Sequence, residues 1–400
     1  MSALSFRPVS EANVAGKRVL LRVDLNVPMR DGKVSDATRI ERVLPVIRDL
    51  VRRGARVILL SHYGRPKGKR APEFSLRPVA DELRRRLDGI AVAFVEDCIG
   101  EAAEAAVAQM KDGDVLVLEN LRFHPGEEAN DPEFVRALAR LGDLYVNDAF
   151  SVSHRAHAST EGIARVLPAY AGPLMAAEIN ALASVLENPA RPVAGIVGGA
   201  KVSTKISVLT NLVQKLDHIV IGGGMANTFL HAQGVEIGTS LCEPDLAGKA
   251  REILDAAREA GCEVVLPQDV VVAREFAEGA PSQSVPVGAV PADSMILDIG
   301  PQSVTALTGL ISQCRTLLWN GPMGAFEIAP FGEGTFALAR EAARLTREGR
   351  LVTVAGGGDT VAALNAAGVT QDFTYVSTAG GAFLEWLEGK ELPGVAALRQ

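Results

Sequence analysis

An apolar segment leads directly into paired glycines and a lysine in the stretch Val193-Ala194-Gly195-Ile196-Val197-Gly198-Gly199-Ala200-Lys201. The apolar residues are typical of a buried β-strand, and the glycines allow a tight turn where backbone can approach a ligand. Other predicted strands of the second half lead into Gly222-Gly223-Gly224, Asn320-Gly321-Pro322, Gly356-Gly357-Gly358-Asp359-Thr360 and Gly380-Gly381. Such strands predict a parallel α/β sheet with a ligand beyond their carboxyl ends.

The predicted strands of the first half end instead in charged and polar clusters. These clusters are Arg22-Val23-Asp24-Leu25-Asn26, Ser61-His62-Tyr63-Gly64-Arg65, Glu119-Asn120-Leu121-Arg122 and His154-Arg155-Ala156-His157. Arginine suits forked recognition of carboxylate or phosphate, so these strand ends indicate one polyanionic small molecule. One half would grip a compact anion and the other would bring its backbone close to phosphates. This pairing predicts transfer between two ligands.

Length and hydrophobic periodicity predict two α/β domains. The 400 residues exceed what one hydrophobic core usually supports, and short Val, Ile and Leu runs alternate with segments of helical period. Strands are expected at residues 18–23, 56–60, 91–95, 115–118 and 144–146, and then at 193–197, 218–221, 263–266, 295–299, 316–319, 351–355 and 373–376. Between the two sets, residues 167–192 hold one helical stretch among four prolines, which we expect to be an inter-domain helix. Residues 64–72 and 278–291 are expected to be surface loops.

The composition limits which classes of binding partner and which cellular compartment we expect. The net charge of -7 and the absence of a long basic tract disfavour nucleic acid. Four scattered cysteines give no disulfide framework and no CxxC motif, and we expect them to be reduced. Residues 1–10 have no apolar core, which disfavours a secretory signal, and no apolar run is long enough to span a membrane. We therefore expect a cytoplasmic protein without a membrane partner.

Asp24, Asn26 and Arg39 are the first candidates for the anion site. Asp24 and Asn26 lie two residues apart, so their side chains point the same way if the strand geometry persists. A simple turn is the alternative, since both residue types favour turns. Arg39 begins a predicted helix with Asp36 or Thr38 available as N-cap, and a bound anion would offset the unfavourable position of a cation there. A solvated surface arginine is the alternative.

The remaining candidates of the first half are His62, Arg65, Arg122 and Arg155. His62 and Arg65 flank a glycine that permits a tight turn at a ligand. Arg155 stands between His154 and His157, and this histidine pair could suggest a metal. No third ligand has a recognisable spacing, so we favour anion recognition by arginine.

In the second half, Lys201 and Lys205 are expected to share the face of a helix at its N-terminus. Two cations there repel each other and oppose the helix dipole, and a phosphate would relieve both effects. The alternative is a solvated lysine face. Residues 356–360 are expected to end a strand and open a helix, with backbone N–H groups for phosphate beside Asp359 as a holder of hydrated Mg²⁺. Residues 222–224 lack a full GxGxxG, so we interpret them as a wall of close backbone approach to a flat base.

Together these stretches resemble the phosphoglycerate kinase family from residue 18 to residue 394. The motifs that carry the resemblance are residues 22–28, 61–66, 154–159, 198–205, 319–327 (WNGPMGAFE), 356–360 and 388–390. The resemblance implies two Rossmann-like domains with parallel sheets facing a central cleft, joined by an inter-domain helix. The implied limits are residues 1–172, the helix 173–190, residues 191–385, and a tail 386–400 that returns to the N-terminal domain.

The resemblance also implies a reaction and its residues. The reaction is reversible phosphoryl transfer between 1,3-bisphosphoglycerate and Mg-ADP, giving 3-phosphoglycerate and Mg-ATP, in glycolysis and gluconeogenesis. The implied phosphoglycerate contacts are Asp24, Asn26, Arg39, His62, Arg65, Arg122 and Arg155. The implied nucleotide contacts are Lys201, Lys205, Asn320, Glu327, Gly357, Gly358, Asp359 and Thr360, with Glu327 at the ribose, Asp359 at the metal and Thr360 at a phosphate.

At several positions the residue differs from the one that is most common in the motifs of the family. Ala379 stands where a glycine is usual, and alanine takes positive φ less freely, which puts the phosphate site at Gly380 and Gly381 in question. Phe383 replaces a small residue, and residues 151–153 also differ.

We expect direct in-line transfer by a monomer, with hinge closure around residues 167–192. Arg39, Lys201, Lys205, Gly380 and Gly381 would act on the migrating phosphoryl group. A nicotinamide dehydrogenase and a non-catalytic solute-binding protein are the alternatives.

Overall fold

The computed structural model describes residues 5–399, which form two compact units. Unit 1 contains the residues up to Ile179 and the segment from Glu391, and unit 2 is Asn180–Lys390. The long helix α6 (Pro173–Leu186) contains the boundary, between Ile179 and Asn180. A helix therefore lies within residues 167–192 as expected, and the second segment of unit 1 begins at Glu391, while the implied domain limits stay predictions.

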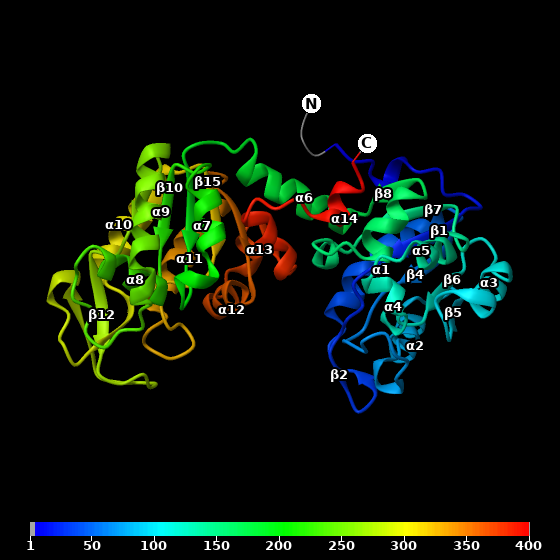
Figure 1. Cartoon of the computed structure of the whole chain (residues 1–400), viewed down its shortest axis with the longest axis horizontal. Coiled ribbons are helices and arrows are strands. Elements are labelled where there is room, and N and C mark those ends of the chain that lie inside the picture. The colour runs from blue at the N-terminus through cyan, green and yellow to red at the C-terminus, as the bar shows by residue number, and fades with distance from the viewer. Residues whose placement is uncertain (1–4, 400) are drawn as a thin grey trace. The chain divides into compact units, whose positions relative to one another are not determined.

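Unit 1 is built on a six-stranded parallel sheet with the order β5-β6-β4-β1-β7-β8 (Figure 1). Its strands are β1 (Arg18–Arg22), β4 (Arg56–Leu60), β5 (Val92–Val95), β6 (Val115–Leu118), β7 (Leu144–Asn147) and β8 (Ala169–Ala171). Its helices are α1 (Thr38–Arg52), α2 (Arg77–Arg86), α3 (Gly100–Ala108), α4 (Pro125–Glu128), α5 (Pro132–Ala139) and α14 (Pro393–Ala396). Short helical turns lie at η3 (Leu121–Phe123), η4 (Phe150–Val152) and η5 (Ala158–Gly162). An antiparallel hairpin, β2 (Met29–Arg30) and β3 (Lys33–Val34), precedes α1.

Both faces of this sheet are buried, as a parallel sheet requires. Val19 and Leu21 of β1 pack in one cluster with Ile40 and Ile47 of α1 and Leu83 of α2. The apolar run of β1 is continuous because Leu20, between Val19 and Leu21, faces the opposite side of the sheet and is also packed there. A Cβ added to Gly142 would lie only 2.4 Å from the side chain of Leu20.

Unit 2 has a second six-stranded parallel sheet, with the order β11-β10-β9-β15-β16-β17 (Figure 1). Its strands are β9 (Val193–Val197), β10 (His218–Ile221), β11 (Glu263–Val265), β15 (Thr316–Asn320), β16 (Val352–Gly356) and β17 (Tyr375–Ser377). Its helices are α7 (Ile206–Leu212), α8 (Gly224–Ala232), α9 (Ala247–Ala260), α10 (Pro301–Gln313), α11 (Glu333–Arg347), α12 (Gly358–Ala367) and α13 (Gly381–Leu387). Ile196 of β9 and Trp319 of β15 pack with Ile311 of α10 and Leu338 of α11 in one core cluster. The prediction of an α/β fold with two parallel sheets is confirmed.

Three strands form a separate antiparallel sheet in unit 2 that the sequence pattern did not reveal. They are β12 (Asp269–Ala273), β13 (Ser282–Pro286) and β14 (Met295–Ile299), in the order β13-β12-β14. The strand expected at residues 295–299 is present, but it is not part of the parallel sheet. The expectation of a loop at residues 278–291 was wrong where it covers β13, because this polar edge strand is largely exposed and lacks apolar periodicity.

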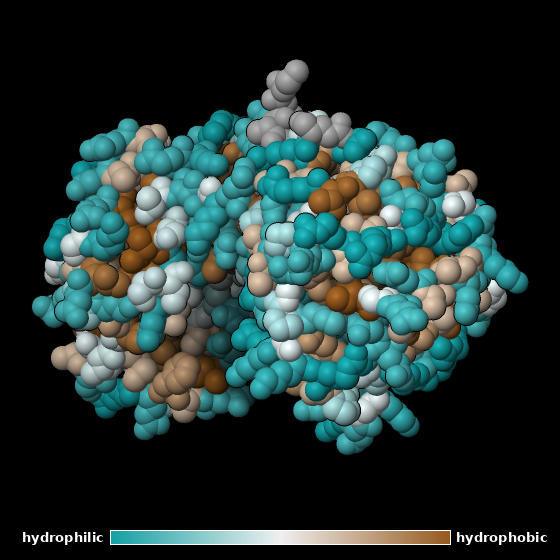
Figure 2. Space-filling model, turned by 45° about the vertical axis from the view of Figure 1, so that its right-hand side comes forward, coloured by the Kyte–Doolittle hydropathy of each residue, from teal (hydrophilic) through white to brown (hydrophobic). Residues whose placement is uncertain are grey.

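The surface in Figure 2 is mainly hydrophilic in the view shown, with apolar patches scattered over it. Within residues 5–399, no helix combines the length and the apolar character that crossing a bilayer needs.

Candidate active site

Most of the candidate residues lie beyond the carboxyl ends of the parallel strands, and the strand order of each sheet reverses at its central strands. In unit 1 the central strand β1 pairs with β4 on one side and β7 on the other. In unit 2 the central strand β9 pairs with β10 on one side and β15 on the other. Ligands of open parallel sheets bind beyond the carboxyl ends of such strands. The polar clusters of unit 1 and the glycines of unit 2 occupy these positions.

Arg22, the last residue of β1, is buried and holds His62 in one tautomer. Its Nε donates to Oγ of Ser159 at 2.9 Å, and one Nη atom lies 3.1 Å from Nδ1 of His62. A guanidinium can only donate, so Nδ1 accepts and the ring proton is on Nε2. Burial, and next the charge of Arg22, lowers the pKa of His62 well below its ordinary value. His62 is therefore neutral.

Glu127 in α4 is a buried acid near Arg22 that sequence reasoning missed. Its Oε1 accepts from the backbone N–H of Ser159 at 2.8 Å, and its Oε2 is buried without a hydrogen-bond partner. Burial raises the pKa of Glu127, and the charge of Arg22 opposes that rise. Glu127 lies in a Gly-Glu-Glu segment, which is typical of solvent-exposed surface. No local signal in the sequence therefore indicated that its side chain is buried near Arg22.

Asp24 and Asn26 form the turn that was the alternative to a ligand site, and the turn also connects three segments. Oδ1 of Asp24 accepts from the backbone of Asn26 at 3.1 Å, while Oδ2 accepts from Oγ of Ser151 at 2.7 Å. Oδ1 of Asn26 accepts from the backbone of Gly64 at 3.0 Å. Arg39 donates to the carbonyl of Asn26 at 2.5 Å and lies 3.3 Å from Oδ1 of Asp24. The turn thus holds the end of β1 beside α1 and the loop after β4.

Asn120 is a second residue whose role was not foreseen, because it positions Arg122. Its Oδ1 accepts from the backbone N–H groups of Tyr63 and Arg122, at 3.2 and 3.1 Å. Arg122 donates from one Nη to the carbonyl of Gly64 at 3.1 Å, and its buried Nε has no hydrogen-bond partner but lies 3.9 Å from Oε1 of Glu128. Burial lowers the pKa of Arg122. An incompletely satisfied buried guanidinium favours an anionic ligand.

The other unit 1 candidates are Arg65 and Arg155. Arg65 is exposed directly after β4, and Nε of Arg155 donates to Nε2 of His154 at 3.3 Å. Burial lowers the pKa of the neighbouring His157 to about 4, so this ring is also neutral.

Two glycines of unit 2 allow backbone segments to touch. A Cβ on Gly198 would lie 1.9 Å from the carbonyl oxygen of Pro322, and a Cβ on Gly321 would lie 2.1 Å from that of Gly198. The backbone N–H of Gly198 donates to the carbonyl of Asn320 at 2.9 Å. Gly198 and Gly321 therefore allow close contact between the ends of β9 and β15, in addition to any contact with a ligand.

A pocket of about 360 Å³ lies beside these segments. It is lined by Gly199, Ala200, Gly223, Gly224, Leu241, Phe276, Met323, Glu327 and Asp359, among others. Pockets of this volume accept small organic ligands. The interpretation of residues 222–224 as a wall agrees with the position of Gly223 and Gly224, and Glu327 and Asp359 provide carboxylates in the same lining.

Lys205 and Asn320 form the polar centre of unit 2. Nζ of Lys205 donates to Oδ1 of Asn320, and Nδ2 of Asn320 donates to the carbonyl of Gly356 at 2.8 Å. Burial lowers the pKa of Lys205, while Asp359 opposes the shift. Oγ1 of the buried Thr360 accepts from the backbone N–H of residue 321 at 2.7 Å. The end of β15 thus orients an ammonium group near the start of α12.

The expectation that Lys201 and Lys205 share a helix face was wrong. Lys201 is exposed with extended backbone before a short turn, η7 (Val202–Thr204), and Lys205 precedes α7. The two residues therefore flank η7 and neither lies within a helix. Residue 199 itself has φ 139°, and the two lysines are separated by the short 3-10 turn η7.

The substitution at Ala379 does not disturb the backbone of its turn. Among described residues other than glycine, positive φ occurs only at Asp31, Lys67 and Asn130. The left-handed position is Gly380, with φ 55°, and α13 starts at Gly381. Phe383 is fully buried, and its ring would lie 2.6 Å from a Cβ on Gly356. The large side chain therefore packs directly beneath the backbone at the end of β16.

One unit with clustered arginines and neutral histidines, and another with a glycine-lined pocket beside a lysine and carboxylates, define a phosphotransferase for small molecules. The family model of phosphoglycerate kinase matches residues 9–390. The chain belongs to the phosphoglycerate kinase family.

Relatives along the whole chain agree with this assignment. The chain is 65% identical over 395 residues to a phosphoglycerate kinase of Methylorubrum extorquens, covering 98% of both chains. It is 62% identical over 398 residues to that of Sinorhizobium fredii, covering 99% of this chain and all of the relative. The solved phosphoglycerate kinase of Coxiella burnetii has a TM-score of 0.93 and 44% identity, with 98% and 99% of the two chains covered. For the Pyrococcus horikoshii enzyme the TM-score is 0.79 and the identity 32%, with 98% of each chain covered.

Proposed function

We propose that the chain catalyses reversible phosphoryl transfer between 1,3-bisphosphoglycerate and ADP, giving 3-phosphoglycerate and ATP. The observation that carries this proposal is the placement of one site at each strand-order reversal, with arginines in unit 1 and the glycine-lined pocket in unit 2. A carboxylate-bearing phosphate ester matches the first site, and a purine nucleotide matches the second.

For the acid substrate we assign Asp24, Asn26, Arg39, His62, Arg65, Arg122 and Arg155. The support for Arg122 is its buried Nε without a hydrogen-bond partner, and the support for His62 is a neutral ring with a donor on Nε2. A neutral histidine can donate to a phosphate or carboxylate without adding charge. The arginines then supply the positive field.

For the nucleotide we assign Lys201, Lys205, Asn320, Glu327, Gly357, Gly358, Asp359 and Thr360. Glu327 and Asp359 both line the pocket, which supports a ribose contact for Glu327 and a metal contact for Asp359. A carboxylate beside a phosphate-sized space fits hydrated Mg²⁺, which binds few protein ligands and keeps its waters. When bound, Mg²⁺ would neutralise charge on the nucleotide phosphates.

The catalytic step that we propose is direct, with no phosphorylated enzyme. Arg39 and Lys205 would stabilise the charge of the migrating phosphoryl group, and Lys201 and the backbone of Gly380 and Gly381 would assist. Because Arg39 belongs to unit 1 and Lys205 to unit 2, we propose closure about α6 during turnover.

A coupled assay tests the reaction. The purified chain is mixed with 3-phosphoglycerate and Mg-ATP, and the 1,3-bisphosphoglycerate formed is consumed by glyceraldehyde-3-phosphate dehydrogenase with loss of NADH absorbance. We expect turnover that needs both substrates. NADH oxidation without the coupling enzyme would favour a dehydrogenase, and binding without turnover would favour a solute-binding protein. A stable phosphorylated protein in the absence of acceptor would contradict the direct step.

A further inference from the structure

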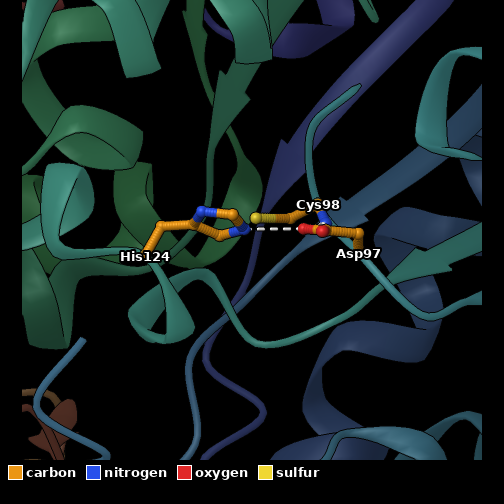
Figure 3. A group of neighbouring side chains, drawn as sticks. All are labelled: Asp97, Cys98 and His124. Atoms are coloured by element: carbon orange, nitrogen blue, oxygen red, sulfur yellow. Dashed lines mark hydrogen bonds and ion pairs between the residues drawn. The ribbon is translucent and has the colours of Figure 1, made fainter. Parts of the chain in front are cut away.

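An aspartate, a cysteine and a histidine meet in unit 1 without a role in the proposed reaction. Asp97 and Cys98 lie in the loop between β5 and α3, and His124 lies between η3 and α4. One ligand atom from each lies within 4.8 Å of the other two (Figure 3). Among residues 5–399, this is the one group of three or more His, Cys, Asp or Glu side chains with that spacing.

The three side chains are held in place by contacts that orient their ligand atoms. Nε2 of His124 lies 2.6 Å from Oδ1 of Asp97, and the backbone N–H of Cys98 donates to the same oxygen at 2.7 Å. The ring of Phe134 packs on the imidazole with 5.4 Å between centroids. Figure 3 shows the carboxylate and the imidazole pointing toward each other, with the sulfur beside the line that joins them.

We propose that Asp97, Cys98 and His124 bind one Zn²⁺ ion or a similar borderline-soft divalent cation. Thiolate, imidazole and carboxylate are the ligands that zinc takes in proteins, and three of them leave a fourth position for water. Mg²⁺ and Ca²⁺ prefer sites made of oxygen ligands, so the sulfur and the nitrogen select against them. The cation would take the place of the direct contact between Nε2 of His124 and Oδ1 of Asp97.

The charges around the group suit a divalent cation. A thiolate and a carboxylate neutralise Zn²⁺, and a neutral cluster can be buried at lower cost than separate charges. Arg70 approaches the other oxygen of Asp97, with Nη2 3.4 Å from Oδ2, and so leaves Oδ1 for the metal. Cys98 is fully buried, whereas the side chains of Asp97 and His124 are about one third exposed, at 32% and 29%. The cation can therefore enter from the side of the imidazole and the carboxylate.

A reactive thiol is the main rival interpretation of the same three residues. Cys98 is fully buried, so its free thiol is not accessible as a nucleophile to a molecule in solution. A second histidine and carboxylate pair offers an internal comparison. Nδ1 of His218 lies 2.8 Å from Glu263, and Cys262 is next in sequence, yet these three do not form a group with the required spacing.

Titration of the metal-free full-length chain with Co²⁺ in excess Mg²⁺ tests the site. The Mg²⁺ occupies sites made of oxygen ligands, including any at Asp359. We expect a thiolate-to-cobalt charge-transfer band that saturates at one ion per chain and disappears when Zn²⁺ is added. Cys98→Ser and His124→Gln should abolish the band and weaken Zn²⁺ binding, measured by calorimetry, at least tenfold.

His218→Gln and Cys242→Ser are the matched controls, and both should keep the band. Because Cys98 is buried and His124 packs on Phe134, circular dichroism must show that both Cys98→Ser and His124→Gln are folded, and the two variants then test the site independently. The absence of a band in the wild type, or its survival in folded His124→Gln and Cys98→Ser, would overturn the proposal. Neither result bears on the kinase assay, which does not depend on this group.

Discussion

A nitrogen of the Arg22 guanidinium lies 3.1 Å from Nδ1 of His62, and both side chains are buried. Asparagine can place its oxygen near the position of Nδ1, whereas glutamine reaches the position of Nε2. We expect His62→Asn to keep the partner of Arg22 and His62→Gln to lose it, at a cost of about 1–3 kcal/mol for an unsatisfied buried group. Urea unfolding of both variants measures the difference. Equal stabilities would show that the Arg22 contact does not matter.

Asp148 gives the protein a pH-dependent stability term. Its Oδ1 accepts from the backbone N–H groups of Leu174 and Met175 at the start of α6, at 2.7 and 3.1 Å, and burial raises its pKa to about 7. Between pH ~4 and pH ~7, the carboxyl of Asp148 keeps its proton in the folded state but releases it in the unfolded state. The stability of the folded state therefore falls as the pH rises through this window. Asp148→Asn keeps an acceptor for both N–H groups. It should remove the pH-dependent contribution of Asp148 to the free energy of unfolding, which is on the order of a few kcal/mol across this window.

Denaturation of both proteins from pH 4 to pH 8 checks this prediction. Asp298 has a similarly raised pKa of about 7 and remains in the variant, so the slope should decrease without vanishing. An unchanged slope would mean that Asp148 does not titrate in this range.

Arg39→Ala should lower kcat much more than it raises the KM of the nucleotide. The side chain of Arg39 is 44% exposed and belongs to unit 1, so its loss removes charge stabilisation without creating a cavity. We expect a decrease in kcat of about 10²-fold or more, as for a lost electrostatic contact in a transition state. Arg52→Ala, at the exposed end of the same helix, is the control and should leave kcat unchanged. An unchanged kcat in Arg39→Ala would remove Arg39 from the chemistry.

Asn320 should act through Lys205, which can be tested by comparing two substitutions. Asn320→Asp keeps an acceptor for Nζ of Lys205, whereas Asn320→Ala removes it, and both substitutions leave the carbonyl of Gly356 without its donor. We expect Asn320→Ala to lower both kcat and stability, the latter by about 1–3 kcal/mol. Asn320→Asp should retain more of kcat than Asn320→Ala in the coupled assay. The reverse order would assign the amide a direct contact with the nucleotide.

Gly380→Ala should destabilise the turn before α13 by backbone strain alone. The residue has φ 55°, yet an added Cβ would meet nothing within 4 Å. A left-handed alanine costs about 1–3 kcal/mol. Gly248→Ala is the matched control, because that position in α9 is also open but has no positive φ, and it should gain about 0.5–1 kcal/mol. Chemical denaturation compares the two; equal effects would exclude strain as the cause.

The parallel sheets were predictable because buried strands give continuous apolar runs. The strands at residues 56–60, 115–118, 193–197 and 218–221 begin and end where the sequence predicted. The antiparallel sheet of unit 2 was not predictable from the sequence, because β13 is polar and β12 follows β11 too closely for a helical crossover. The short strand β8 was missed because it has three residues and lies in the segment assigned to the connector.

The charged candidates were recognisable from the sequence, but their supports were not. Arg22, Asn120 and Glu127 act through long-range contacts between loops, and no local periodicity encodes such contacts. Likewise, no local periodicity indicates that the short 3-10 turn η7 separates Lys201 from Lys205. The predicted roles of the site residues, the monomer and the cytoplasmic location stay predictions.

The chain enters unit 1 twice, and this has a consequence for synthesis. The segment from Glu391 belongs to unit 1: Arg399 bridges to Phe6, and the backbone of Gly394 donates to the carbonyl of Ser153 at 2.9 Å. A Cβ on Gly394 would lie 2.9 Å from the side chain of Ser153, so the two backbones pack closely. Residues 180–390 of unit 2 are made before Glu391 and the residues that follow it, so the contacts of this segment within unit 1 form only after unit 2 has been made. A segment made after unit 2 therefore adds its contacts to a domain whose other residues were made before unit 2.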